Sequence, residues 1–124
     1  MKLKTDHVDL VQVYADNISA PPPYDVIQAM LDARESGKTR FLGYNGENED
    51  AEWAVQSGLF CTLQTSFNLV DQRARYGLFD QARSNGIGII VKRPLGKAMW
   101  DKAASAGGEG GLSGTDLERF KRAK

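Results

Sequence analysis

The sequence predicts an α/β fold: a partial (β/α)8 TIM barrel, with four parallel strands and helices between them. Strand-like and helix-like segments alternate along the chain, polar residues follow each strand, and glutamine occurs inside two of the strands. Joining parallel strands takes a connection of about a dozen residues or more, usually a helix, so this alternation requires a parallel sheet. An open sheet covered by helices on both faces needs apolar side chains on both faces. The two glutamines therefore favour a barrel.

The predicted strands are four short apolar segments, at Val8–Tyr14, Thr39–Tyr44, Cys61–Phe67 and Ile87–Lys92. The predicted helices lie between them, at Tyr24–Ser36, Glu49–Ser57 and Arg73–Asn85. Three prolines precede the first helix, whose first turn tolerates the missing N–H of proline. Glycine follows each helix and supplies the left-handed residue that commonly ends one. Asp71 is predicted as the N-cap of the third helix.

The chain is predicted to change character after Gly96. Residues 1–96 form the partial barrel domain, and residues 97–124 form a Gly-rich linker and a short terminal helix. The linker contains the run GGEGG, which is too rich in glycine for regular structure. Thr115 and Glu118 have the spacing of a capping box. A complete barrel takes about 250 residues, so a chain of 124 residues is expected to hold only part of one.

Composition excludes several classes of function. The chain has 16 basic and 16 acidic residues, so no overall charge attracts nucleic acid or an anionic membrane. No apolar run approaches the ~20 residues of a membrane span, and the N-terminus lacks the apolar core of a signal peptide. We therefore expect a cytoplasmic protein. The single cysteine, Cys61, excludes an internal disulfide and a cysteine-based zinc cluster, and no metal site is predicted.

Side chains alternate across a strand, so each predicted strand presents two rows of residues. The more apolar row is expected to face the helices, and the other row is expected to face inward. The inward row carries the polar side chains, which are Gln12, Tyr14, Asn45, Gln64, Ser66 and Lys92. Because parallel α/β proteins bind ligands at the carboxyl ends of their strands, this row contains the candidate site.

Four segments at these strands resemble the fourth to seventh βα units of the aldo-keto reductase superfamily. They are LKTDHVDLVQVYADN, GKTRFLGYNG, LQTSFNLVDQRA and GIGIIVKRPLG, which occur in the family's order over about residues 3–96. The resemblance implies a (β/α)8 barrel that reduces aldehydes or ketones to alcohols without a metal. It implies a small-molecule carbonyl substrate and a nicotinamide dinucleotide cofactor, which is NADP in most members, with NAD as the alternative.

The resemblance also assigns roles to residues of this chain. Tyr14 takes the place of the family's catalytic histidine and can donate a hydrogen bond to a carbonyl oxygen. The catalytic Asp, Tyr and Lys of the family belong to units that would precede Met1, so little or no activity is expected of this chain alone. The predicted cofactor-binding residues, which hold the nicotinamide carboxamide or lie near the pyrophosphate, are Asn45, Gly46, Gln64, Lys92, Arg93, Pro94 and Leu95.

Each of these assignments has a structural alternative. Tyr14 can fill the barrel mouth, Gln64 can bond to neighbouring barrel side chains, and Lys92 and Arg93 can be solvated charges at the end of a loop. Two other functions also stay open. One is a non-catalytic half-barrel that forms a homo-oligomer through its exposed strand edges. The other is a small phosphate-binding module that uses Lys92 and Arg93 without redox chemistry.

Overall fold

The computed structural model describes residues 4–14 and 22–96. Its elements, in chain order, are β1 (Val8–Tyr14), α1 (Tyr24–Glu35), β2 (Thr39–Asn45), α2 (Asn48–Gln56), β3 (Thr62–Ser66), the 3-10 helix η1 (Arg73–Arg75), α3 (Leu78–Ser84) and β4 (Gly88–Lys92). The predicted linker and terminal helix in residues 97–124 lie outside the described residues. The predicted strands are confirmed to within about one residue at each end.

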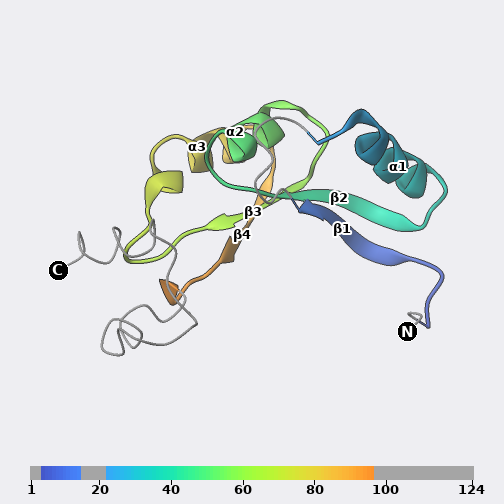
Figure 1. Ribbon diagram of the computed structural model, residues 1–124, viewed down its shortest axis with the longest axis horizontal. Helices are drawn as coiled ribbons and strands as arrows, with labels where there is room; N and C mark the ends of the chain where they lie inside the picture. The colour runs from blue at the N-terminus through green and yellow to red at the C-terminus, as the bar shows by residue number, and fades with distance from the viewer. Residues whose placement is uncertain (1–3, 15–21, 97–124) are drawn as a thin grey trace.

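The sheet is parallel throughout, in the order β1-β2-β3-β4. In Figure 1 the helices α1, α2 and α3 all lie on the same side of the sheet, and the other side carries no helix of the described chain. This one-sided cover is the arrangement of a barrel wall, in which helices form the outer layer and side chains of the bare face point inward. The fold class predicted from the sequence is therefore confirmed.

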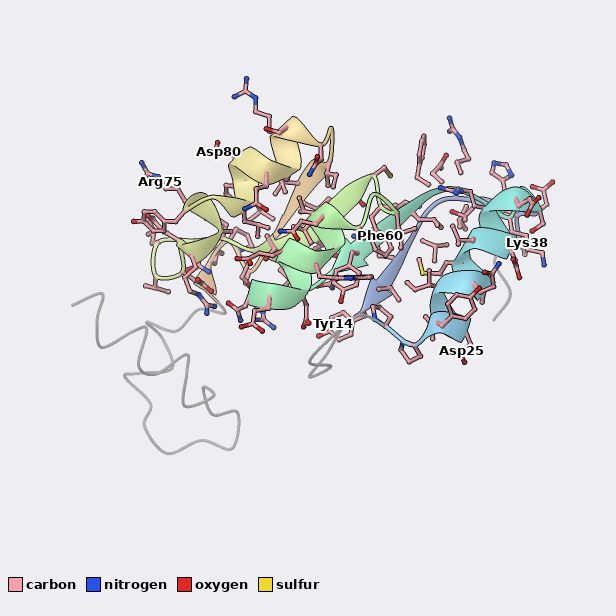
Figure 2. The ribbon with its side chains drawn as sticks, turned by 90° about the horizontal axis from the view of Figure 1, so that it is seen from above. Tyr14, Asp25, Lys38, Phe60, Arg75 and Asp80 are labelled. Carbon is pink, nitrogen blue, oxygen red and sulfur yellow. The ribbon has the colours of Figure 1, made fainter. Side chains whose placement is uncertain are left out.

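The core lies between the sheet and the helices. Tyr44, Trp53 and Phe60 form its aromatic centre, with ring centroids 5.2–6.1 Å apart. The other buried apolar side chains come from the strands and from the inner sides of the helices, and include Leu42, Ala51, Ala54, Val55, Leu63 and Ala82. Figure 2 views the molecule from the helix side, and Phe60 lies there between α1 and α2. Burying each large apolar side chain contributes about 1.5–3 kcal/mol.

The alternation predicted for the strands is confirmed on β2. Leu42 and Tyr44 point to the helices and are 3% and 0% exposed. Phe41, on the other face, is 47% exposed. The polar row of the strands therefore belongs to the bare face of the sheet.

The prediction of one continuous third helix is wrong. The segment divides into η1 and α3, because Gly77 between them has a φ of 100°, which no α-helix contains. Asp71 is also not the N-cap: the cap positions are Gln72 for η1 and Gly77 for α3, and neither makes a side-chain cap bond. Instead the Asp71 carboxylate accepts a hydrogen bond from Arg73 Nε at 3.1 Å.

Candidate functional site

The sheet register brings three predicted site residues side by side at the carboxyl ends of the strands. Tyr14 on β1 pairs with Asn45 on β2, and Asn45 pairs with Gln64 on β3. Laterally paired residues of a parallel sheet share a face, so the three side chains stand on the bare face as neighbours. The predicted polar row is therefore contiguous at this point: the Tyr14 ring and the amides of Asn45 and Gln64 lie next to one another at the carboxyl ends of the strands.

The layer just below this edge is tightly packed. A Cβ atom at Gly43 would lie 2.3 Å from Thr62 Oγ1 and 2.9 Å from Gln12 Cγ, so only glycine fits between these two side chains. Gln12 Nε2 and Thr62 Oγ1 are buried and have no hydrogen-bond partner among the described residues. This packed layer lies one step before Asn45 and Gln64 along the inward row of the strands.

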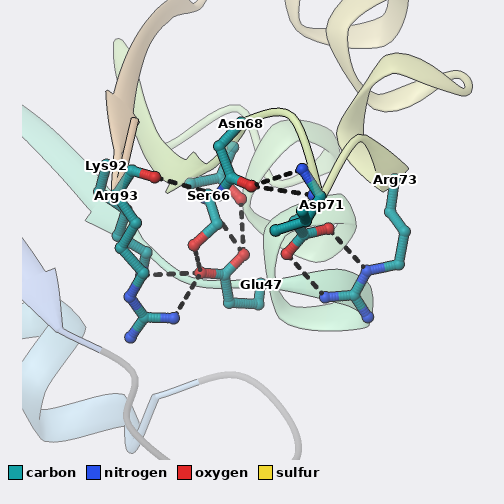
Figure 3. Close-up of polar contacts among 9 residues, drawn as sticks. Glu47, Ser66, Asn68, Asp71, Arg73, Lys92 and Arg93 are labelled. Carbon is teal, nitrogen blue, oxygen red and sulfur yellow. Dashed lines mark hydrogen bonds and ion pairs between the residues drawn. The ribbon is translucent and has the colours of Figure 1, made fainter. Parts of the chain in front are cut away.

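Glu47 is the centre of the polar network at the strand ends, and it immediately precedes α2. The Glu47 carboxylate accepts hydrogen bonds from Ser66 Oγ at 2.6 Å, from Thr65 Oγ1 at 3.0 Å and from the backbone N–H of Ser66 at 3.2 Å. Figure 3 shows it between the end of β3 and two cations. Lys92 Nζ lies 3.1 Å from Glu47 Oε1 and Arg93 Nη1 lies 3.8 Å from it. Glu47 therefore ties together the ends of β2, β3 and β4.

This environment sets the ionisation of Glu47. Partial burial by itself raises the pKa of the carboxyl group, but the hydrogen bonds from Ser66 and the charge of Lys92 outweigh that effect. The pKa of Glu47 is therefore lower than its ordinary value. The group is therefore a carboxylate at neutral pH and forms an ion pair with Lys92.

Lys92 reaches across β3. It pairs with Ser66 in the register of β3 with β4, yet its ammonium donates a hydrogen bond to Asn45 Oδ1 on β2 at 2.5 Å. The ammonium also lies 5.9 Å from the centre of the Tyr14 ring. The side chain is only 14% exposed, so Lys92 is not the solvated charge that the structural alternative described.

Arg93, Pro94 and Leu95 form the turn that follows β4. The carbonyl oxygen of Arg93 accepts hydrogen bonds from Asn68 Nδ2 at 3.0 Å and from the backbone N–H of Gly96 at 2.8 Å. Arg93 has a left-handed φ of 57°, and its side chain is 34% exposed. Pro94 is exposed and Leu95 is 69% exposed. The guanidinium therefore stands beside Glu47 at the rim of the site.

The two amide side chains differ in their surroundings. Asn45 is 9% exposed and is held by Lys92, whereas the side-chain amide of Gln64 makes no hydrogen bond to another described residue. Gly46 follows Asn45, and its N–H donates to the Gln64 carbonyl at 3.1 Å. A Cβ atom at Gly46 would lie 2.5 Å from Tyr44 Cε1, so only glycine allows this turn to pack directly against the Tyr44 ring. The alternative in which Gln64 bonds to barrel neighbours finds no support in the described chain.

Glu47 was not among the residues predicted from the sequence to form the site. In the sequence it is one of several acidic residues at the start of the second helix, where negative side chains interact favourably with the helix dipole. Its position directly after the strand end, at the same sheet edge as Lys92, was the available signal. A hollow of about 240 Å³ also opens between the start of α2 and η1, with Glu47, Glu52, Asp71 and Arg73 in its wall.

Two kinds of feature are not found in the described part of the chain. No three or more His, Cys, Asp and Glu side chains gather there in an arrangement that could hold a metal ion. None of its helices has the length and apolar character to cross a membrane.

A parallel sheet with helices on its outer face and polar side chains at its strand ends is the arrangement of part of a (β/α)8 barrel. The chain belongs to the Aldo/keto reductase family, whose sequence model matches residues 1–116. The family predicted from the four sequence segments is therefore confirmed.

Two relatives show how much of a family member this chain represents. A candidate aryl-alcohol dehydrogenase of Schizosaccharomyces pombe is 28% identical over 120 residues, which are 90% of this chain and 36% of that protein. The solved apo form of the aldo-keto reductase AKR11C1 from Bacillus halodurans matches with a TM-score of 0.64 at 20% identity, over 77% of this chain and 33% of that one. The second likeness shows the fold. The chain thus spans about a third of the length of either relative.

Proposed function

We propose that this chain supplies the nicotinamide-facing part of an NADP(H)-dependent reductase that converts aldehydes or ketones to alcohols, with NAD(H) as the alternative cofactor. The observation that carries this proposal is the pair of adjacent amides, Asn45 and Gln64, at the ends of β2 and β3. A primary carboxamide has both a donor and an acceptor, and two neighbouring protein amides can satisfy both. The Gln64 side chain supports this role, since it makes no hydrogen bond to another described residue and can pair with a ligand.

The other predicted site residues suit the same ligand. A reduced nicotinamide dinucleotide, if held here, would supply a hydride to the carbonyl carbon of the substrate. Tyr14 is 56% exposed at the mouth, next to Asn45, and its hydroxyl can donate a hydrogen bond to the carbonyl oxygen. Arg93 carries a planar, multi-donor cation at the rim and suits a phosphate of the dinucleotide. Pro94 and Leu95 belong to the same turn as Arg93 and shape the path by which that phosphate approaches the guanidinium.

Turnover is not the test of this proposal. The four segments that carry the resemblance do not include the family's catalytic Asp, Tyr and Lys, and this chain covers 36% of its S. pombe relative. We therefore expect little or no activity from this chain alone, whereas binding at the amide pair can be measured directly.

The experiment is a titration of the folded chain with NADPH, followed by quenching of tryptophan fluorescence. Gln64→Ala should weaken binding about 2–10-fold, which is the loss of one hydrogen bond. The matched control is Gln56→Ala, because Gln56 is exposed on α2 on the helix side of the sheet. Nicotinamide mononucleotide and inorganic phosphate serve as competitors. An absence of saturable quenching, or equal competition by phosphate alone, would contradict the proposal, and the second result would favour the phosphate-binding module.

A second candidate is the half-barrel that associates with another copy. Within the described residues, β1 pairs only with β2 and β4 pairs only with β3, so each has an unpaired edge. Phe41 on the bare face is 47% exposed. Exposed edges of this kind favour strand pairing between chains. Sedimentation equilibrium tests this candidate, and a monomer at all concentrations up to the millimolar range would exclude it.

A further inference from the structure

We propose that Lys92 is a positioning residue that fixes the orientation of the Asn45 amide, so that Asn45 presents its N–H donors to the ligand. This inference rests on the proposed function for the identity of the ligand, but the orientation itself is a property of the free protein. It assigns Lys92 a role inside the site, whereas Arg93 is left as the cation at the rim.

The contact between Lys92 and Asn45 has a defined polarity. An ammonium group can only donate hydrogen bonds, so the Asn45 atom that faces Lys92 Nζ at 2.5 Å is the carbonyl oxygen, Oδ1. The amide nitrogen of Asn45 must then point away from Lys92. A side-chain amide without such a partner can rotate by half a turn and exchange its donor for its acceptor.

The Lys92 ammonium is itself held in place. Lys92 is 14% exposed, and its ammonium is held 3.1 Å from Glu47 Oε1. Glu47 is itself fixed by Ser66 Oγ and Thr65 Oγ1 on β3. The chain of contacts therefore runs from β3 through Glu47 and Lys92 to Asn45, and each acceptor in it faces a donor. Figure 3 shows Glu47 between Ser66 and the two cations.

The consequence is a defined ligand chemistry at Asn45. A group that meets this amide must carry an acceptor, such as the carbonyl oxygen of a primary carboxamide. Gln64, which is not held by any described residue, is free to turn and accept from the ligand N–H. Asn45 thus sets the direction of the ligand amide, and Gln64 adapts to it.

The first test uses the ligand-free chain. The side-chain ¹³Cγ and ¹⁵Nδ2 resonances of Asn45 are recorded for the wild type, Lys92→Met, Lys92→Arg and the control Lys38→Met, which removes an exposed lysine at the far end of α1. We expect Lys92→Met to shift both resonances, and Lys92→Arg to restore them. If the Asn45 resonances are the same in the wild type and Lys92→Met, the inference is overturned, whatever the function of the chain.

The second test inverts the amide. Asn45→Asp keeps an oxygen for Lys92 but replaces the ligand-facing donor with an acceptor. We expect it to stay folded and to bind NADPH at least about tenfold more weakly, while Lys92→Met loses about 3–10-fold and Lys92→Arg stays within about twofold of the wild type. Wild-type affinity in Asn45→Asp would overturn the inference. If the wild type itself does not bind NADPH, the proposed function fails, and the resonances of Asn45 still decide the orientation.

Discussion

Glu47→Gln is the substitution that most directly tests the polar network at the strand ends. Glutamine has the same shape, but it lacks the negative charge and turns one acceptor oxygen into a donor. Hydrogen bonds to a charged group contribute about 1.5–3 kcal/mol, and removing one partner of a buried pair costs about 3–5 kcal/mol. Glu47 is 28% exposed, so solvent reduces the second figure. We expect Glu47→Gln to lower the free energy of unfolding by about 2–3 kcal/mol at pH 7.

The dependence of this loss on pH makes the test specific. The pKa of Glu47 is depressed in the folded chain, so its contribution is complete above the ordinary value of 4.5 and is lost as the pH falls through the folded value. Urea unfolding at several pH values should therefore show the curves of the wild type and Glu47→Gln converging below pH 4.5. Glu52→Gln, an exposed change on α2, is the control. If Glu47→Gln and Glu52→Gln had equal free energies of unfolding at pH 7, the stabilising role of the Glu47 network would be refuted.

Two further predictions concern the layers around the site. Tyr44 Oη is buried without a hydrogen-bond partner among the described residues, so Tyr44→Phe should raise the free energy of unfolding by about 1–3 kcal/mol, whereas exposed Tyr76→Phe should not. Burial raises the pKa of Tyr44 from 10.0 to about 12. The free energy of unfolding of the wild type should therefore fall by about 3 kcal/mol between these two pH values, whereas that of Tyr44→Phe should not. Urea unfolding at both pH values measures this difference. Gly43→Ala, whose Cβ would lie 2.3 Å from Thr62 Oγ1, should cost about 1–3 kcal/mol. Gly88→Ala meets nothing closer than 3.7 Å and should melt like the wild type in thermal unfolding.

The parts of the fold that depend on local pattern could be predicted from the sequence. The alternation within Thr39–Tyr44 assigned Leu42 and Tyr44 to the core and Asn45 to the bare face, because side-chain direction in a strand depends only on residue parity. The break in the third helix could not be predicted in this way. The residues around Gly77 have ordinary helical spacing, so the apolar pattern does not reveal the break. At the start of the segment, the Asn68 side chain accepts hydrogen bonds from the backbone N–H groups of Val70 and Asp71, which competes with helix formation there.

The network around Glu47 depends on contacts between residues distant in the sequence. Lys92 and Asn45 are 47 residues apart and lie on strands that are not neighbours in the sheet. The contact forms because a long lysine side chain spans β3, and no short-range pattern contains that information. The sequence could place both residues at the same sheet edge, but it gave no reason to pair them.

The charges at the strand ends also distinguish the candidate functions. Lys92 is engaged by Glu47 and Asn45, so these side chains together with Arg93 carry a net charge of only about one positive unit. A module built to bind phosphate through two cations would leave both of them free to meet the anion. Here the neutral amides have the central position, and the less engaged guanidinium of Arg93 stands at the rim. NADPH binding should therefore weaken only modestly between low and physiological salt, since one exposed charge is screened, while the contacts of Asn45 and Gln64 are not.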